Sequence, residues 1–241
     1  PISYYPCEFT PTRLEPEPWR YVLVYVLLRA SRGYTHMSLL AQLTAGTTVK
    51  PKSVVKAVKE NPALAADVDP QTGNTPLHLA CCNRAPLAVV EALLAANPAA
   101  ARTPDGEGNL AVHGAVANGC GADVVSALLK RYPESIRKRQ GRHTLLHSAA
   151  CNGQTAEVVA VLLAAWPAAA AEKDEEGNAP LHFAAACKAS PAVVKALLAA
   201  CAEAAGWRGQ MQRYPLSLSL LCEAPPDSVE AIRDAFPAAQ R

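Results

Sequence analysis

The residues best equipped for chemistry in this sequence are histidines, and four of them recur at a nearly fixed interval. His78, His113, His147 and His182 are separated by 35, 34 and 35 residues. Imidazole rings bind metal ions and transfer protons near neutral pH. If each ring lies on its own helix in a stack, however, the helices are about 8–10 Å apart and equivalent rings cannot share one ion. We therefore expect these histidines to have a structural role.

A second arrangement of ligand-type residues lies within one segment. His143, His147 and Cys151 stand at positions i, i+4 and i+8, a spacing that would align three metal ligands on one helical face. His143 precedes the expected helix, so we favour the reading without a metal. The sequence also has no Cys-x-x-Cys pair, no nucleophile elbow and no glycine-rich phosphate loop. We predict no catalytic residue, no metal, no cofactor and no enzyme activity.

Four of the eight cysteines, Cys82, Cys151, Cys187 and Cys222, follow the same interval as the histidines. Cys82 and Cys151 lie four residues after a recurring histidine, and Cys187 lies five residues after His182. This placement predicts one cysteine per repeated unit, not bonded pairs, and therefore free thiols in a reducing compartment. We accordingly predict an intracellular protein, with the cytoplasm favoured and the nucleus or an organelle left open.

Two independent sequence markers share this period, which indicates a repeat array. The first is the histidine motif, best preserved in residues 73–80, Gly-Asn-Thr-Pro-Leu-His-Leu-Ala. The second is a Val-Val, Leu-Leu, Pro pattern that begins at Val89 and recurs at Val124 and Val158, and without the proline at Val193. One further step of 35 residues reaches Ser217, and a backward step of 36 reaches Gln42. The array therefore has about six units.

Each unit has the pattern of a helix, a short link, a second helix and a loop. Thr75 and Pro76 have the residue types of an N-cap and a first helical position. Val89, Val90 and Leu93 form an apolar stripe along the second helix. Burying four such side chains yields roughly 6–12 kcal/mol, far less than the cost of ordering about 35 residues. One unit is therefore unstable alone, and stacked units form an all-α solenoid.

The chain divides into two predicted regions. Residues 1–33 contain a proline-rich arm and a short apolar helix, for which a strand is the alternative, and residues 34–241 contain the repeats. The predicted units are about 34–68, 69–104, 105–138, 139–173, 174–208 and 209–241. The net charge of +2 gives no argument for nucleic-acid binding, and no apolar run is long enough to span a membrane. In the last unit, Ser217, Ser219 and Arg233 replace apolar or motif residues, as a terminal cap requires.

These motifs resemble those of ankyrin-repeat proteins. The Thr-Pro-Leu-His-x-Ala signature is intact at 75–80 and nearly intact at 179–184. The units depart from the family in two ways: their period is 34–36 residues, and Asn97-Pro98 replaces the glycine that usually ends the second helix. The Pro-Ala-Ala sequence at this point resembles repeats common in unicellular algae. The resemblance implies an ankyrin-repeat solenoid, with simple loops in place of β-hairpins, in which the motif histidine hydrogen-bonds near the motif threonine and the adjacent loop.

The resemblance also implies a mode of action, the binding of another protein through a concave face. That face is formed by loop residues before each motif and by residues late in the first helix of each unit. The partner-binding residues predicted in this way are Gln71, Thr72, Asn74, Asn83, Glu107, Asn109, Asn118, Gln140, His143, Asn152, Glu175, Glu176, Asn178, Met211 and Arg213. The face has no aromatic anchor, so we expect modest affinity or a groove for an extended segment.

Five cations cluster near the junction of the third and fourth units. They are Arg131, Arg137, Lys138, Arg139 and Arg142. One interpretation is a basic patch for an acidic partner segment; the other is a solvated loop that attracts the acidic loop at 174–176.

We predict a non-enzymatic module that binds a partner protein, identity unknown, with no nucleic acid and no membrane span. The alternatives are a structural subunit of a larger assembly, docked through residues 1–33, and a regulatory fragment of a larger protein.

Overall fold

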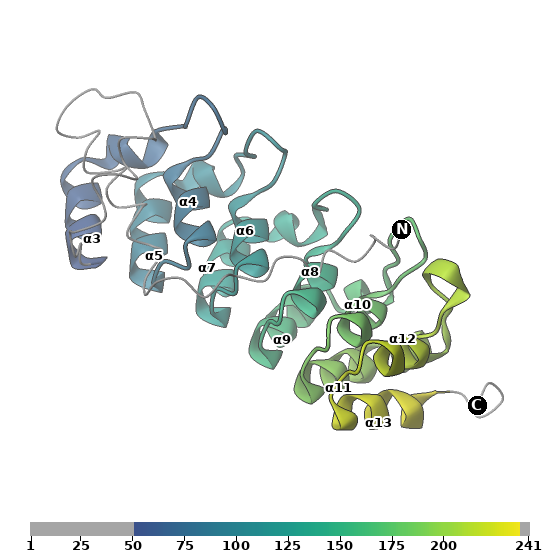
Figure 1. Cartoon of the computed structure of the whole chain (residues 1–241). Helices are drawn as coiled ribbons and strands as arrows, with labels where there is room; N and C mark the ends of the chain where they lie inside the picture. The colour runs from purple at the N-terminus through teal and green to yellow at the C-terminus, as the bar shows by residue number, and fades with distance from the viewer. Residues whose placement is uncertain (1–50, 237–241) are drawn as a thin grey trace.

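The computed structural model describes residues 51–236, which form successive pairs of helices (Figure 1). The α-helices are α3 (Pro51–Glu60), α4 (Pro76–Cys82), α5 (Leu87–Ala96), α6 (Ala111–Ala117), α7 (Ala122–Arg131), α8 (Leu145–Cys151), α9 (Ala156–Ala165), α10 (Pro180–Ala186), α11 (Pro191–Ala200), α12 (Pro215–Leu221) and α13 (Pro226–Ala235). The all-α prediction is confirmed, since over these residues the β-structure is limited to one isolated bridge between Gln140 and His143. The predictions for residues 1–33 and around Gln42 lie outside the described residues.

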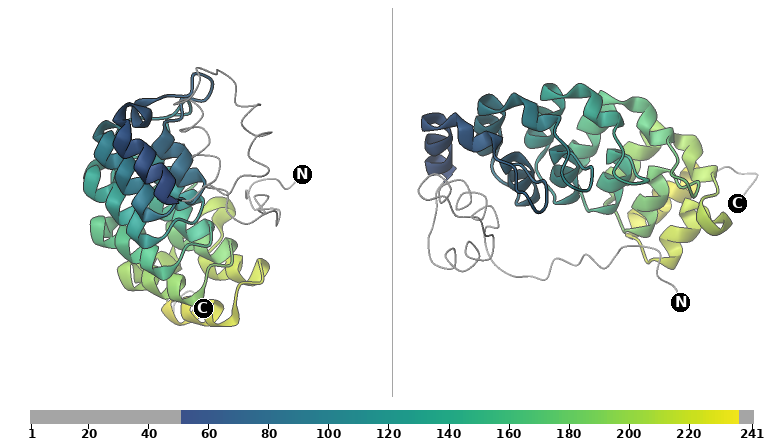
Figure 2. Two further views of the ribbon diagram at one scale, coloured as in Figure 1. Left: turned by 90° about the vertical axis from the view of Figure 1, so that its left-hand side faces the viewer. Right: turned by 90° about the horizontal axis from the view of Figure 1, so that it is seen from above.

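The helices form two rows that run along the array. The seven-residue helices α4, α6, α8, α10 and α12 form the inner row, and the ten-residue helices α3, α5, α7, α9, α11 and α13 form the outer row. Figure 2 shows the same two rows from the side and from above. From α4 to α13 each helix packs on its partner in the same unit and on the equivalent helix of a neighbouring unit, and α3 packs on α5. This arrangement is the predicted solenoid.

The inner helices begin where the sequence predicts, because the cap residues have partners there. Thr75 is the N-cap of α4, and its side-chain oxygen accepts a hydrogen bond from His78 N; Thr144 and His147 repeat this geometry in α8. Pro76 is the first residue of α4, a position whose N–H has no helical partner. The capping chemistry predicted from residues 75–80 is therefore confirmed.

The core follows the same periodicity. Val89, Val90 and Leu93 of α5 are buried, and their equivalents in α7, α9 and α11 are buried as well. Between the inner helices the matching positions hold small residues, such as Ala149 and Ala150, which are also buried. Small side chains let neighbouring inner helices approach closely, while the larger Val and Leu side chains fill the space to the outer row.

A short 3-10 helix follows each outer helix from α3 to α11 and connects it to the next loop. These segments are η1 (Pro62–Ala66), η2 (Pro98–Ala101), η3 (Pro133–Arg137), η4 (Pro167–Ala171) and η5 (Ala202–Gly206); η6 (Gln210–Gln212) lies in the last loop. The residue before η2, η3 and η4 contacts the preceding unit in each case. Asn97 Nδ2 donates to Ala65 O at 2.9 Å, Arg102 lies 5.1 Å from the Tyr132 ring centre, and Arg137 lies 5.4 Å from that of Trp166. The residues that replace the usual glycine therefore join consecutive units.

The link between the two helices of each unit contains one residue with positive φ. Gly119 and Gly153 occupy this position in two units, where φ is 79° and 66°. The other units place Arg84, Lys188 and Glu223 there, at φ values of 55°, 57° and 55°. A side chain with a Cβ is strained in this left-handed region, so three of the five links carry a local cost of about 1–2 kcal/mol.

This position predicts a stabilising substitution. We expect Lys188→Gly to raise the free energy of unfolding by about 0.5–1 kcal/mol, because glycine relieves the left-handed strain and the Lys188 side chain is exposed. Urea denaturation would measure the change, with Gly153→Lys as the reciprocal variant, expected to be destabilised. A lower midpoint for Lys188→Gly would contradict this account of the link.

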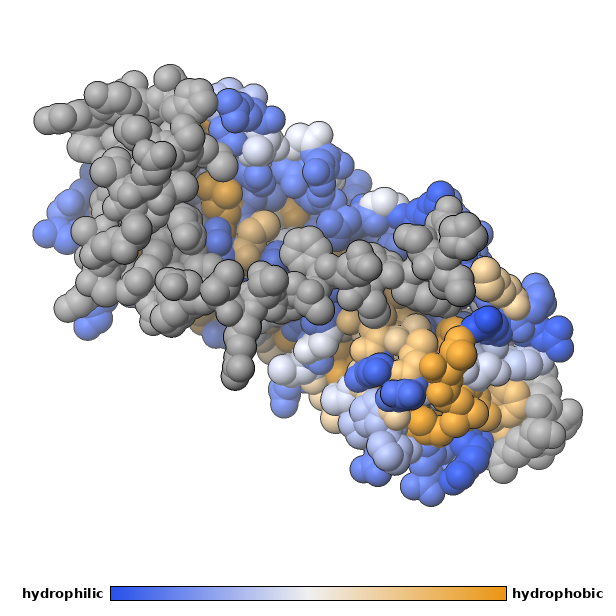
Figure 3. Space-filling view, viewed as in Figure 1, coloured by the Kyte–Doolittle hydropathy of each residue, from blue (hydrophilic) through white to orange (hydrophobic). Residues whose placement is uncertain are grey.

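The last unit differs in part from the expected terminal cap. Ser217 is exposed as predicted, but Ser219 is fully buried, and its hydroxyl donates to Leu216 O at 2.8 Å. Its position points into the helix pair and not toward solvent, so its assignment to a water-facing cap was wrong. Leu220 and Leu221 are exposed instead, by 62% and 63%. Both belong to α12, over which Figure 3 shows an apolar area.

Candidate partner-binding surface

The predicted contact residues form one surface, which we call the recognition face. It consists of the loops 69–74, 105–109, 140–143, 174–178 and 209–213 together with the C-terminal ends of the inner helices. The side chains of Gln71, Thr72, Glu107, Asn118, Asn152, Glu175 and Met211 are exposed, and those of Asn74, Asn83, Asn109, Gln140, His143, Glu176 and Arg213 are partly exposed. These residues are accessible to a partner along the length of the array.

Asn178 is the member of the set that cannot make a side-chain contact with a partner. It is 3% exposed. Its Nδ2 donates to Asp174 Oδ2 at 3.1 Å, and its Oδ1 accepts from Gln210 N at 2.9 Å. The amide thus ties the loop 174–178 to the loop 209–213, which covers it. The sequence prediction treated every loop Asn as surface, and for Asn178 that was wrong.

Three loop aspartates missed by the sequence analysis set the shape of this face. Asp105 Oδ1 accepts from Glu107 N and Asn109 N at 2.9 and 2.8 Å, and Asp174 Oδ1 repeats the two bonds at 2.9 and 2.8 Å. Asp69 accepts from the backbone of Thr72 at 3.2 Å. The sequence contains a signal for them. Asp69, Asp105 and Asp174 each lie five or six residues before the first motif position of their own unit, which in the second unit is Thr75.

Two glycines allow neighbouring loops to touch. Gly106 N donates to Thr72 O at 2.8 Å, and a Cβ atom on Gly73 would come within 2.5 Å of Gly106 N. Any side chain at Gly73 would force the loops 69–74 and 105–109 apart. These two loops therefore form a continuous edge rather than separate projections.

The four recurring histidines connect each unit to the following loop. Their Nε2 atoms lie 3.0–3.2 Å from the backbone carbonyl oxygens of Asn109, Lys138, Asn178 and Trp207. A carbonyl oxygen only accepts, so each Nε2 carries the proton. Each Nδ1 in turn accepts from the N–H of the residue three positions earlier, at 2.9–3.3 Å. The rings are neutral structural links, as the sequence predicted.

Burial disfavours the charged form of these rings. It lowers the pKa of His147 and of His182 to about 4, although the hydrogen bonds to backbone carbonyls act in the opposite direction. Burial also lowers the pKa of His78 and His113. A ring that is neutral, with both nitrogens bonded, is poorly suited to proton transfer.

The three-ligand arrangement at 143–151 does not assemble. His143 precedes α8 and packs edge-on against Phe183, with 4.9 Å between ring centres. Both nitrogens of His147 are hydrogen-bonded, and Cys151 is bonded to another cysteine. No group of three His, Cys, Asp or Glu side chains with metal-site geometry occurs within residues 51–236.

The five predicted cations do not form one patch. Arg139 pairs with Glu172 at 2.8 Å, and Arg142 pairs with Glu175 and Glu176 at 3.1 and 3.3 Å. These partners belong to the next loop, so the interpretation of two mutually attracting loops applies to Arg139 and Arg142. Arg137 stacks on Trp166, and Arg131 and Lys138 are exposed.

The prediction that the cysteines form no bonded pairs was wrong for Cys151 and Cys187. Cys151, the last residue of α8, and Cys187, the C-cap of α10, form a disulfide with their Cα atoms 5.1 Å apart. The two residues occupy positions four and five after their motif histidines. That offset of one residue places them opposite each other across two units. Among the described residues the remaining cysteines, Cys81, Cys82, Cys120, Cys201 and Cys222, are free thiols.

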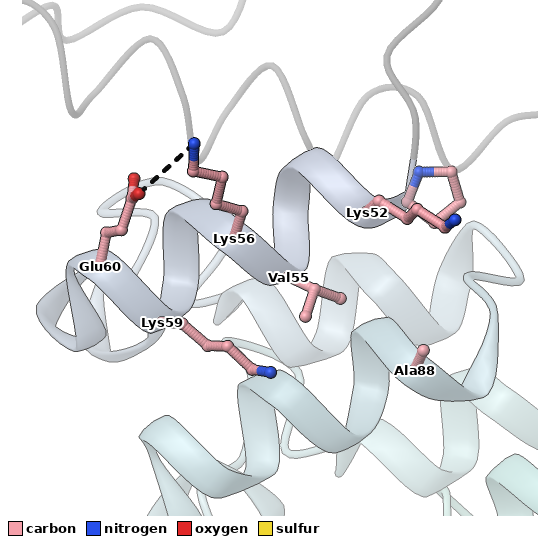
Figure 4. A pocket seen from close by; sticks show the side chains of 7 residues that line it. Lys52, Val55, Lys56, Lys59, Glu60 and Ala88 are labelled. Atoms are coloured by element: carbon pink, nitrogen blue, oxygen red, sulfur yellow. Dashed lines mark ion pairs between the residues drawn. The ribbon is translucent and has the colours of Figure 1, made fainter.

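A separate groove lies away from the recognition face, between α3 and α5 (Figure 4). It has a volume of about 440 Å³. Val55 and Ala88 line its floor, and Lys52, Lys56 and Lys59 surround it, with Lys56 3.7 Å from Glu60. Its lining contains none of the predicted contact residues.

A family model described as ankyrin repeats (3 copies) matches residues 49–140 and 112–205. No curated protein matches the chain. Within residues 51–236, no helix has both the length and the apolar character needed to cross a membrane.

Proposed function

The chain belongs to the ankyrin-repeat family, and on this premise we propose that it is a non-enzymatic module that binds another protein through the recognition face. Ankyrin repeats generally mediate protein–protein interaction. The observation that carries the proposal is the order of the face. Asp105 and Asp174 fix two of its loops from within, and the motif histidines fix each unit to the next loop. A surface fixed before binding loses little conformational entropy when a partner docks.

The composition of the face indicates the kind of segment it accepts. Its helix-end positions hold small side chains such as Cys82 and Ala117, with amides such as Asn118 and Asn152 beside them. Small side chains leave room for a partner backbone, and amides donate to and accept from peptide groups. We propose that the partner presents an extended segment.

We also propose that some of the cations at the junction of the third and fourth units contact an acidic segment of the partner. Arg139 and Arg142 are already paired within the chain, so the contribution falls to Arg131, Arg137 and Lys138. Charge reversal at these three positions should weaken binding and reduce its salt dependence.

Binding experiments with two charge-insertion variants test the main proposal. Partners would first be identified by cross-linking and mass spectrometry in the native source, and then purified. We expect Asn152→Arg combined with Met211→Arg to weaken binding by about 30-fold or more, because both side chains are exposed on the recognition face. The matched control, Ala95→Arg with Ala160→Arg, places the same charge on exposed positions of α5 and α9 and should change affinity less than about twofold. The reverse pattern would refute the proposal.

A further inference from the structure

The Cys151–Cys187 disulfide lies on the recognition face, not in the core. It joins the end of α8 to the end of α10, and both residues are partly exposed. Asn152, next to Cys151, is one of the predicted contact residues. The bond therefore sits where a partner would dock and within reach of small thiols from solvent.

Within residues 51–236 one bonded pair stands at this kind of position. Cys151 lies four residues after the motif histidine of its unit, and Cys187 lies five residues after that of the next unit. In the other adjacent units, the same two positions hold Cys82 and Asn118, Ala117 and Asn152, and Ala186 and Cys222. Each of these pairs has at most one cysteine. The described free thiols nearest the core differ in character, since Cys81 and Cys120 are buried, and burial raises the pKa of the Cys120 thiol to about 11. Cys151 and Cys187 are thus chemically set apart from them.

We propose that Cys151 and Cys187 form a thiol–disulfide exchange site that controls the rigidity of the recognition face, with a dithiol reductant as its reaction partner. The functional part of this inference rests on the proposed function. A thiolate of the reductant attacks one cysteine sulfur, the Cys–Cys bond breaks, and the other cysteine leaves as a thiolate that takes a proton from water. The second thiol of the reductant then attacks the mixed disulfide. The products are two protein thiols and the oxidised reductant, a transfer of two electrons and two protons.

The bond constrains the two units that flank it. It closes a loop with a sequence separation of 36 residues, so its loss restores considerable freedom to the opened chain. In the reduced protein, α8 and α10 remain joined by packing and by the His147 hydrogen bond to Asn178 O. The fourth and fifth units then open more often, and the oxidised form is the one ordered for binding.

Hydrogen exchange with and without dithiothreitol tests the inference on the protein alone. In the oxidised full-length protein we expect a cross-linked peptide that contains Cys151 and Cys187. Reduction should add two alkylatable thiols and speed amide exchange in α8 and α10 by about tenfold or more. Cys82→Ser should respond like the wild type, and Cys151→Ser with Cys187→Ser should exchange like the reduced protein in both conditions.

Two results would overturn it. One is the absence of the cross-linked peptide after equilibration with oxidised glutathione; the other is equal exchange before and after reduction. Because no partner is present in this experiment, its failure is separate from failure of the proposed function. If the double variant does not fold, the comparison of wild type and Cys82→Ser with and without dithiothreitol still decides the question.

Discussion

Acidification from pH 7 to pH 5 is expected to lower the free energy of unfolding by about 4 kcal/mol through His147 and His182 alone. The folded state keeps the pKa of each ring at about 4, whereas the pKa of an unfolded histidine is about 6.5. Over this pH range the difference lowers the free energy of unfolding by about 2 kcal/mol per ring. Between the two pKa values the unfolded chain binds a proton that the folded chain does not. Stability is therefore complete above pH 6.5 and is lost as the pH falls toward 4.

Urea denaturation at the two pH values, with matched variants, would measure this effect. His147→Gln and His182→Gln should be less stable at pH 7, because buried N–H and C=O groups lose their partner, but should show a smaller loss on acidification. His143→Gln serves as the control, since that side chain is partly exposed and lies before the helix. A double Gln variant with the full wild-type response to pH would show that other groups cause it.

The second large effect follows from the repeat geometry around the disulfide. We expect Asn118→Cys to form a new disulfide with Cys82, because these positions match Cys187 and Cys151 one pair of units earlier. Closing a loop of the same length should stabilise the oxidised protein by about 2–4 kcal/mol relative to its reduced form. Thermal denaturation and peptide mapping under both conditions would measure this.

The controls for this prediction come from the same set of positions. Asn118→Ser should not form the bond, and Asn152→Cys should form no second bond because Ala117 stands at its partner position. In the native protein Cys82 Sγ lies near Gly114, at 3.0 Å from where a Cβ on that glycine would be, so the side chain must turn toward position 118. Failure of Cys82 to cross-link to Asn118→Cys would show that the units are not equivalent at their inner edge.

The periodic features of this chain were predictable because each repeats several times. The motif at 75–80 predicted the capped helices, and the Val-Val, Leu-Leu pattern predicted the outer row and its buried face. Each of these signals depends only on residues close in sequence and on the period. They also predicted that the recurrent imidazoles serve the structure.

The features that were missed depend on contacts between particular neighbours. Arg139 and Glu172 meet because they lie on adjacent loops, and their separation in sequence does not show which cation finds which acid. Asn178 is buried because the loop 209–213 crosses it. Gly209 allows this close approach, since a Cβ atom at that position would collide with Asn178 Oδ1. The disulfide depends on a shift of one residue between two units. Such details arise where units deviate from one another.

The histidine links also give the array a direction. The imidazoles of His78 and His147 each belong to one unit but donate a hydrogen bond to a carbonyl of the unit that follows, as His147 does to Asn178 O. Cleavage that removes the fifth and sixth units would leave the ring donor of His147 without its acceptor, Asn178 O. Trimming from the other end would free only a carbonyl, such as Asn109 O, which solvent readily satisfies. Proteolytic erosion should therefore be more damaging from the carboxyl end than from the amino end.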